Sequence, residues 1–107
     1  MIDNYAKAME LIKNIKSHLP ITAYPAQNLL RLIQQKKINL SFDQDVLIED
    51  VMYMGDDGGI CCNIRMPEGK KEVLIASLTH LRIPNKHPLS KEINDYQKKR
   101  IKNLSNQ

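Results

Sequence analysis

Tryptophan is absent from this 107-residue chain and phenylalanine occurs once, so aromatic residues make up only 5% of it. A core built from such a composition is expected to be mostly aliphatic. Long hydrophobic runs are also absent, because Lys7, Glu10 and Lys13 interrupt the apolar positions near the N-terminus. We therefore expect neither a signal peptide nor a membrane span.

Cysteine is scarce: the only two are the neighbours Cys61 and Cys62. Adjacent Cα atoms lie about 3.8 Å apart, below the usual disulfide separation of about 4.4–6.8 Å. A structural disulfide within the chain is not expected, which fits a reducing cytoplasm. A zinc site would need four converging ligands, and adjacent cysteines on a strand point to opposite faces. No metal is predicted, and the glycines form no phosphate-binding motif, so no cofactor is predicted either.

What the chain does contain is an ordinary globular composition, with 42% hydrophobic and 26% charged residues. Its length suits one domain over residues 1–107. The net charge of +4 is unevenly distributed: +4 over residues 1–39, −6 over 40–64 and +6 over 65–107. The basic C-terminal part could meet a polyanion, and the acidic middle could equally be its internal counterpart.

Apolar residues at helical spacing predict three helices. The first covers residues 3–19 with Asp3 as its N-cap, and the second covers residues 25–36 with Pro25 at its first position. The third runs from Pro88 or Ser90 to about Leu104, with Lys and Arg on its outer side and towards its end.

Between the second and third helices, runs rich in Val, Ile and Tyr predict strands at residues 46–54, 60–66 and 72–81. The short connections at 55–59 and 67–70 suit hairpins. The predicted fold is therefore α+β, with two N-terminal helices, a three-stranded antiparallel β-meander and a C-terminal helix, in the order ααβββα. A two-residue turn at Asp57-Gly58 would place Val51 opposite Ile64, and a turn at 68–69 would place Ile64 opposite Val73.

The glycine-rich stretch 55–59 is the first candidate site. In the predicted register His80 lies beside this loop, so His80 as acid or base with Asp57 or Asp56 as its orienting group would form a small catalytic site. The alternative is that Asp and Gly are here because they form turns, with His80 bonded to the backbone. The turn interpretation is preferred, because the site is incomplete.

The second candidate is a surface for partners. One face of the predicted sheet carries Met52, Met54 and Leu74, which is too apolar for open solvent and indicates cover by the last helix or by a partner. The basic C-terminal helix offers the anion-binding residues Lys98, Lys99 and Lys102, with Arg82 nearby in the sequence. The sequence thus favours a small cytoplasmic, non-enzymatic interaction module that binds a protein partner or a second copy of itself. Nucleic acid is a further candidate partner, and an enzyme or ligand-binding protein with the Asp/His site is the alternative.

Overall fold

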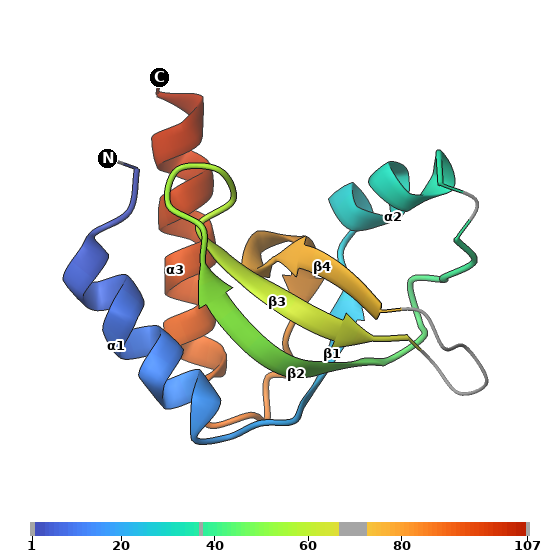
Figure 1. The fold of residues 1–107 in the computed structure, drawn as a ribbon, viewed down its shortest axis with the longest axis horizontal. Helices are drawn as coiled ribbons and strands as arrows, with labels where there is room; N and C mark the ends of the chain where they lie inside the picture. Colours follow the sequence, from blue (N-terminus) through green and yellow to red (C-terminus); the bar gives the residue numbers. More distant parts are fainter. Residues whose placement is uncertain (1, 37, 67–72, 107) are drawn as a thin grey trace.

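The computed structural model describes residues 2–36, 38–66 and 73–106 of the chain. Within these ranges the elements are, in order, α1 (Tyr5–Lys16), β1 (Ile21–Pro25), α2 (Gln27–Gln34), β2 (Val46–Tyr53), β3 (Ile60–Arg65), β4 (Val73–Ser77), the 3-10 helix η1 (Leu78–His80), β5 (Leu81–Arg82) and α3 (Ser90–Ser105) (Figure 1). The α+β class with an antiparallel sheet, predicted from the sequence, is confirmed.

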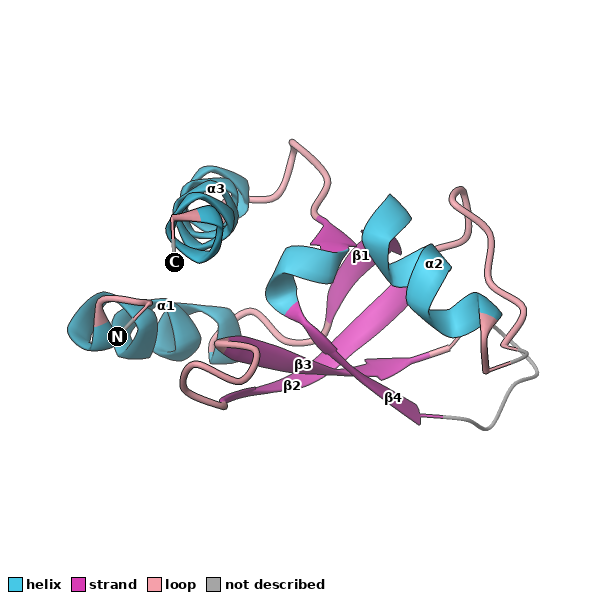
Figure 2. Ribbon diagram, turned by 90° about the horizontal axis from the view of Figure 1, so that it is seen from above, coloured by secondary structure: helices cyan, strands magenta, loops and turns pink. Residues whose placement is uncertain are grey.

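One antiparallel sheet contains the five described strands, in the hydrogen-bonding order β4-β3-β2-β1-β5. Although β4 and β5 are at opposite ends of this order, only the three residues of η1 separate them along the chain. A connection this short spans at most about 10–14 Å, so the sheet has to curl until its two edges approach each other. Because of this curl, β1 does not lie in one plane with β3 and β4, and the view from above shows it apart from them (Figure 2).

Aliphatic side chains form the core, as the composition predicts. Ile15 of α1, Ile48 of β2 and Ile93 of α3 are completely buried, and each of the other four strands also contributes a buried residue to the core. Helices α1 and α3 lie side by side at one end of the sheet, and α2 lies at the other end (Figures 1 and 2). The packing of α1 against α3 brings the two ends of the chain together.

The prediction of two consecutive N-terminal helices is wrong, because strand β1 lies between them. Its residues alternate in burial, with Ile21, Ala23 and Pro25 inside, which is the period-two pattern of a half-buried strand. Pro25 therefore ends a strand instead of starting a helix, and α2 begins at Gln27. Helix α1 is also shorter than predicted: Asn4 and not Asp3 caps it, and it ends at Lys16 instead of Leu19.

The three-stranded meander is wrong as a description of the sheet, although β2, β3 and β4 are antiparallel neighbours. Strand β1 pairs with β2 on one side and with β5 on the other, which makes five strands. The predicted strand at 72–81 breaks after Ser77, whose hydroxyl accepts a hydrogen bond from the amide of Thr79 and so starts η1. The chain then turns and pairs with the opposite edge of the sheet.

The register differs from the prediction at both hairpins. Residues 54–59 form a longer loop, closed by hydrogen bonds from the Met54 amide to the Gly59 carbonyl (2.7 Å) and from the Gly59 amide to the Gly55 carbonyl (2.8 Å). Val51 therefore pairs with Cys62 instead of Ile64.

Strand β4 is shifted by one residue, so that Ile64 pairs with Leu74 instead of Val73. The predicted turn at 67–70 lies outside the described residues. Because side chains alternate along a strand, a one-residue shift turns every side chain to the other face. In this register Val73 and Ile75 are 57% and 60% exposed, whereas Ala76 is buried.

Candidate functional site

A buried ion pair joins the two ends of the chain. A side-chain oxygen of Asp3 lies 2.9 Å from Nη1 of Arg100 in α3, and the two side chains are only 4% and 3% exposed. The same Asp3 oxygen accepts hydrogen bonds from the hydroxyls of Tyr53 (3.2 Å) and Tyr96 (3.1 Å). Buried charges are tolerated when they are paired and hydrogen-bonded. This cluster therefore fastens the N-terminal segment to β2 and α3.

The 54–59 loop is held by the same cluster. The second guanidinium nitrogen of Arg100 donates to the Asp56 carbonyl (3.0 Å), and the Ile2 amide donates to the Asp56 carboxylate (3.1 Å). At the end of the loop, the Ile60 amide donates to the Tyr96 hydroxyl (2.9 Å). Burial raises the pKa of Tyr96 well above its ordinary value. The phenol therefore stays protonated and keeps its hydrogen-bonding role.

Gly59 is required where the loop meets the cluster. Its φ is +66°, and a Cβ atom at this position would lie 2.3 Å from the Tyr96 hydroxyl and 2.8 Å from both Arg100 and Asp3. A positive φ strains other residues. The glycine-rich stretch thus serves as a close-fitting anchor for the chain ends.

The structure does not bring His80 and the two aspartates of the predicted Asp/His site together by any contact among the described residues. His80 ends η1, where its carbonyl accepts from the Ala26 amide, and burial alone lowers the pKa of its ring. A neighbouring carboxylate would instead raise that pKa. Asp56 is bonded to Ile2, and Asp57 is exposed.

The two cysteines are free thiols inside the protein. Cys61 is 7% exposed and Cys62 is completely buried. Burial raises the pKa of the Cys61 thiol, and raises that of Cys62 to about 12. Neither thiol is therefore a reactive thiolate near neutral pH. In the described parts of the chain, no three His, Cys, Asp or Glu side chains are grouped so as to hold a metal ion.

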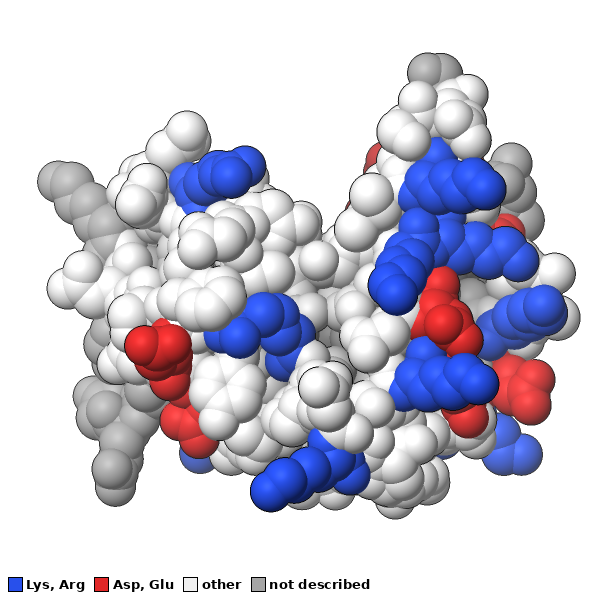
Figure 3. Space-filling view, turned by 180° about the vertical axis from the view of Figure 1, so that it is seen from behind, with Lys and Arg blue, Asp and Glu red and all other residues white. Residues whose placement is uncertain are grey.

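The four predicted anion-binding residues are divided among three places. Arg82 lies over the ring of Phe42 (3.5 Å to its centre) and donates to the carbonyls of Pro25 and Phe42, so it holds the loop before β2. Lys98 and Lys102 are exposed and one turn apart on α3, whereas Lys99 lines a groove towards α1. On the face seen in Figure 3, Lys and Arg side chains gather along α3 with some acidic side chains between them.

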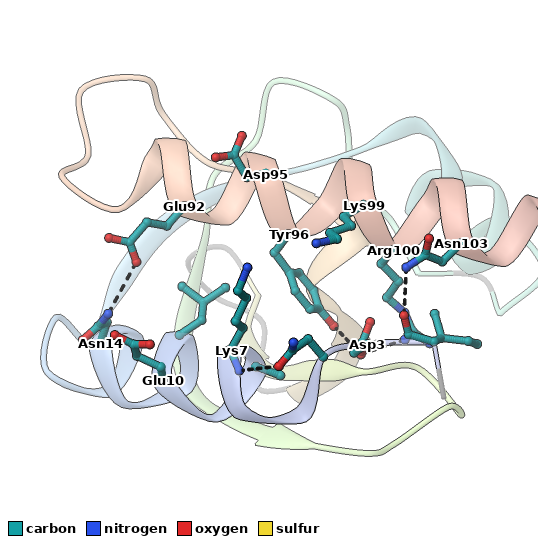
Figure 4. A pocket seen from close by; sticks show the side chains of 14 residues that line it. Asp3, Lys7, Glu10, Asn14, Glu92, Asp95, Tyr96, Lys99, Arg100 and Asn103 are labelled. Atoms are coloured by element: carbon teal, nitrogen blue, oxygen red, sulfur yellow. Dashed lines mark hydrogen bonds and ion pairs between the residues drawn. The ribbon is translucent and has the colours of Figure 1, made fainter.

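That groove lies between α1 and α3 and has a volume of about 530 Å³. Most of the residues that line it are polar or charged (Figure 4), and its apolar part comes from Ile2, Ala8, Leu11 and Tyr96. The charged side chains that line it are Asp3, Lys7, Glu10, Glu92, Asp95, Lys99 and Arg100. Among these, only Asp3 and Arg100 form an ion pair with a described residue.

Strand β4 forms an edge of the sheet that no other described element covers. Among the described elements, β4 makes extensive contacts only with β3. Within the described chain, residues 73–77 form no backbone hydrogen bond apart from those to β3 in the sheet. The exposed Val73 and Ile75 project from this edge strand. The strand contains neither a charged residue nor proline, which are the usual features that keep an edge from pairing.

Sequence reasoning missed the Asp3 and Arg100 pair, although one signal was present. Arg100 lies seven residues after Ile93 and four after Tyr96, on the stripe of α3 that faces the core. A charged residue on an apolar stripe indicates a buried partner. Asp3 was assigned to helix capping, so its role as that partner was not predicted.

Comparison of the chain with models of protein families, with curated proteins and with solved structures gives no match. Among the described helices, none has the length and apolar character needed to cross a membrane.

Proposed function

We propose that this protein is a non-enzymatic interaction module that self-associates through the free edge of β4. The observation that carries the proposal is the exposure of Val73 (57%) and Ile75 (60%) on an edge strand that no other described element covers. Exposed strands of this kind recruit another strand, because main-chain hydrogen bonds and apolar contacts form together.

A second copy suits this edge because the strand is compatible with itself. If two β4 strands pair antiparallel about Ile75, then Val73 lies opposite Ser77 and Leu74 lies opposite Ala76. No like charges would then face each other, since residues 73–77 are all neutral. The nearest charged residue on β3, Arg65, is neutralised by Glu49 at 3.1 Å. Such a pairing gives a symmetric dimer in which the same patch meets itself.

A charge placed on the edge tests this proposal. Ile75→Lys should abolish association, because pairing would bring two lysines together on a surface that loses its apolar contacts. Leu32→Lys is the matched control, since Leu32 is 52% exposed but belongs to α2. Light scattering after size exclusion measures the mass of each, and circular dichroism checks that both variants are folded. Equal association of the two variants would refute a role for β4.

A second candidate function is the binding of a polyanion, such as nucleic acid, by α3. It is favoured by Lys98 and Lys102, which are exposed, lie one turn apart and form no ion pair with a described residue. Reversing both to Glu should weaken binding to a DNA duplex and reduce its dependence on salt, by about 0.9 in the log–log slope per lost phosphate contact. The control reverses Lys13 and Lys16, which are also exposed but lie on α1. An unchanged affinity in the α3 variant would exclude this function.

A further inference from the structure

A hydrogen bond between the two walls marks each end of the groove between α1 and α3. Helices α1 and α3 run antiparallel along it, as two hydrogen bonds show: Asn14 donates to Glu92 at one end (3.4 Å), and Asn103 donates to the carbonyl of Ile2 at the other (2.9 Å). Positions along the two helices can therefore be matched. Using a helical rise of about 1.5 Å per residue, Lys7 and Lys99 each lie about 10 Å from the Asn14 and Glu92 end.

Charges of opposite sign are separated along this groove. The Asn14 end carries Glu10 from α1 and Glu92 from α3, whereas Lys7 and Lys99 come from the two helices nearer the other end (Figure 4). Asp95, three residues after Glu92 on α3, also lines the groove, although its side chain points away from α1 (Figure 4). The groove is therefore acidic at one end and basic further along.

Lys7 and Lys99 consequently lie at the same level on the two walls, whereas Glu10 lies about 6 Å further along the groove than Glu92. The amines of Lys7 and Lys99 both extend into the space between the helices (Figure 4), and no acidic side chain of the described chain lies within ion-pairing distance of either. Glu10 likewise has no cationic partner among the described residues. Facing like charges repel each other. A bound molecule that carries both signs would relieve the repulsion at each end.

From this arrangement we infer that the groove binds a short zwitterionic peptide, with its ammonium group between Glu10 and Glu92 and its carboxylate between Lys7 and Lys99. Lys7 lies three residues from Glu10, and Lys99 seven from Glu92, so the two charged levels are separated by about 5–10 Å. An extended chain of two or three residues spans about 7–10 Å. The volume of about 530 Å³ is within the usual range for small-ligand sites.

The rest of the groove fits the same ligand. Ala8, Leu11 and Tyr96 provide an apolar wall between the two charged levels, against which small side chains can pack. At the acidic end, the carboxylates of the described residues form no cluster of three that could hold a metal ion. An organic ammonium group, which needs less exact geometry than a metal, is the cation that fits there.

Titration of the isotope-labelled protein with trialanine tests this inference. Saturable shifts of amide signals should appear along both walls, at residues 7–14 of α1 and 92–103 of α3. N-acetyl-trialanine amide, which has the same length but no charge, should cause none. Shifts of equal size with the capped peptide, or no saturable shift with trialanine, would overturn the inference.

Variants locate the site within the groove. Lys7→Glu and Lys99→Glu should each weaken trialanine binding at least tenfold, because each places a carboxylate beside that of the peptide. Lys13→Glu makes the same change of charge on α1 at an exposed position that does not line the groove, and should bind like the unmodified protein. Equal weakening by all three variants would mean that only net charge matters, and the assigned site would be wrong.

Discussion

Replacing Arg100 by Met should destabilise the protein more than any other single change of a charged residue in α3. Met keeps the length and helix propensity of the side chain but leaves the Asp3 carboxylate buried without its cation. Two hydrogen bonds are lost, to Asp3 (2.9 Å) and to the Asp56 carbonyl (3.0 Å). Breaking a buried ion pair from one side costs about 3–5 kcal/mol, and the two tyrosine hydroxyls that remain on Asp3 favour the lower end of that range.

Urea unfolding measures this loss. A domain of this size has a free energy of unfolding of about 5–16 kcal/mol, so the variant should remain folded in water but unfold much earlier. With a slope of about 2 kcal/mol per molar urea, the midpoint should fall by about 1.5–2 M. Lys99→Met is the control, because it removes a neighbouring but exposed charge and should change stability by no more than about 0.5 kcal/mol.

The double variant distinguishes an unpaired charge from a packing defect. If the loss arises from the isolated Asp3 carboxylate, adding Asp3→Asn to Arg100→Met should recover part of the stability. A loss below about 1 kcal/mol in Arg100→Met, or a double variant less stable than the single one, would refute the reasoning.

Two further predictions concern the same region of the chain. Gly59→Ala should lower the free energy of unfolding by about 2–4 kcal/mol in urea titrations, because strain at φ +66° adds to overlap with the Tyr96 hydroxyl. Gly55 has a similar φ but open space around it, so Gly55→Ala should lower the free energy of unfolding only by the backbone strain of about 1–2 kcal/mol. Equal losses in the two variants would argue against the overlap. Both cysteines should react slowly with a thiol reagent at pH 8 in the folded protein and rapidly in urea, because burial raises their pKa values. A fast reaction of both thiols in the folded protein would contradict their burial.

The helices at the two ends of the chain were predictable because packing and local pattern agree there. In α1, Ala8, Ile12 and Ile15 recur at helical spacing and are buried, and in α3 the stripe through Ile93 behaves in the same way. Helical spacing of apolar residues is a property of the segment itself, so a helix of this kind can be predicted from a single sequence.

Strand β1 and the register of β4 could not be read in this way. β1 has five residues between Pro20 and α2, and its partners in β2 and β5 are distant in sequence. The register of β4 depends on the length of the connection before it, and a one-residue difference exposed Val73 and Ile75. The interaction surface proposed above lies on this shifted strand, so its location depended on information that local patterns do not contain.

The polar cluster was missed for a related reason. Asp3 and Arg100 are separated by almost the entire chain, and no local pattern relates them. The sequence analysis named the glycine-rich loop as a candidate site for His80 and the two aspartates, whereas its contacts with Arg100 and Tyr96 depend on the placement of α3 beside it.

The molar mass of the unmodified protein in solution, measured over a series of concentrations, tests the central claim most directly. The account predicts a mass that rises with concentration towards about twice the 12.3 kDa of one chain, and that stays at one chain in Ile75→Lys. A mass of one chain at every concentration of the unmodified protein would contradict it.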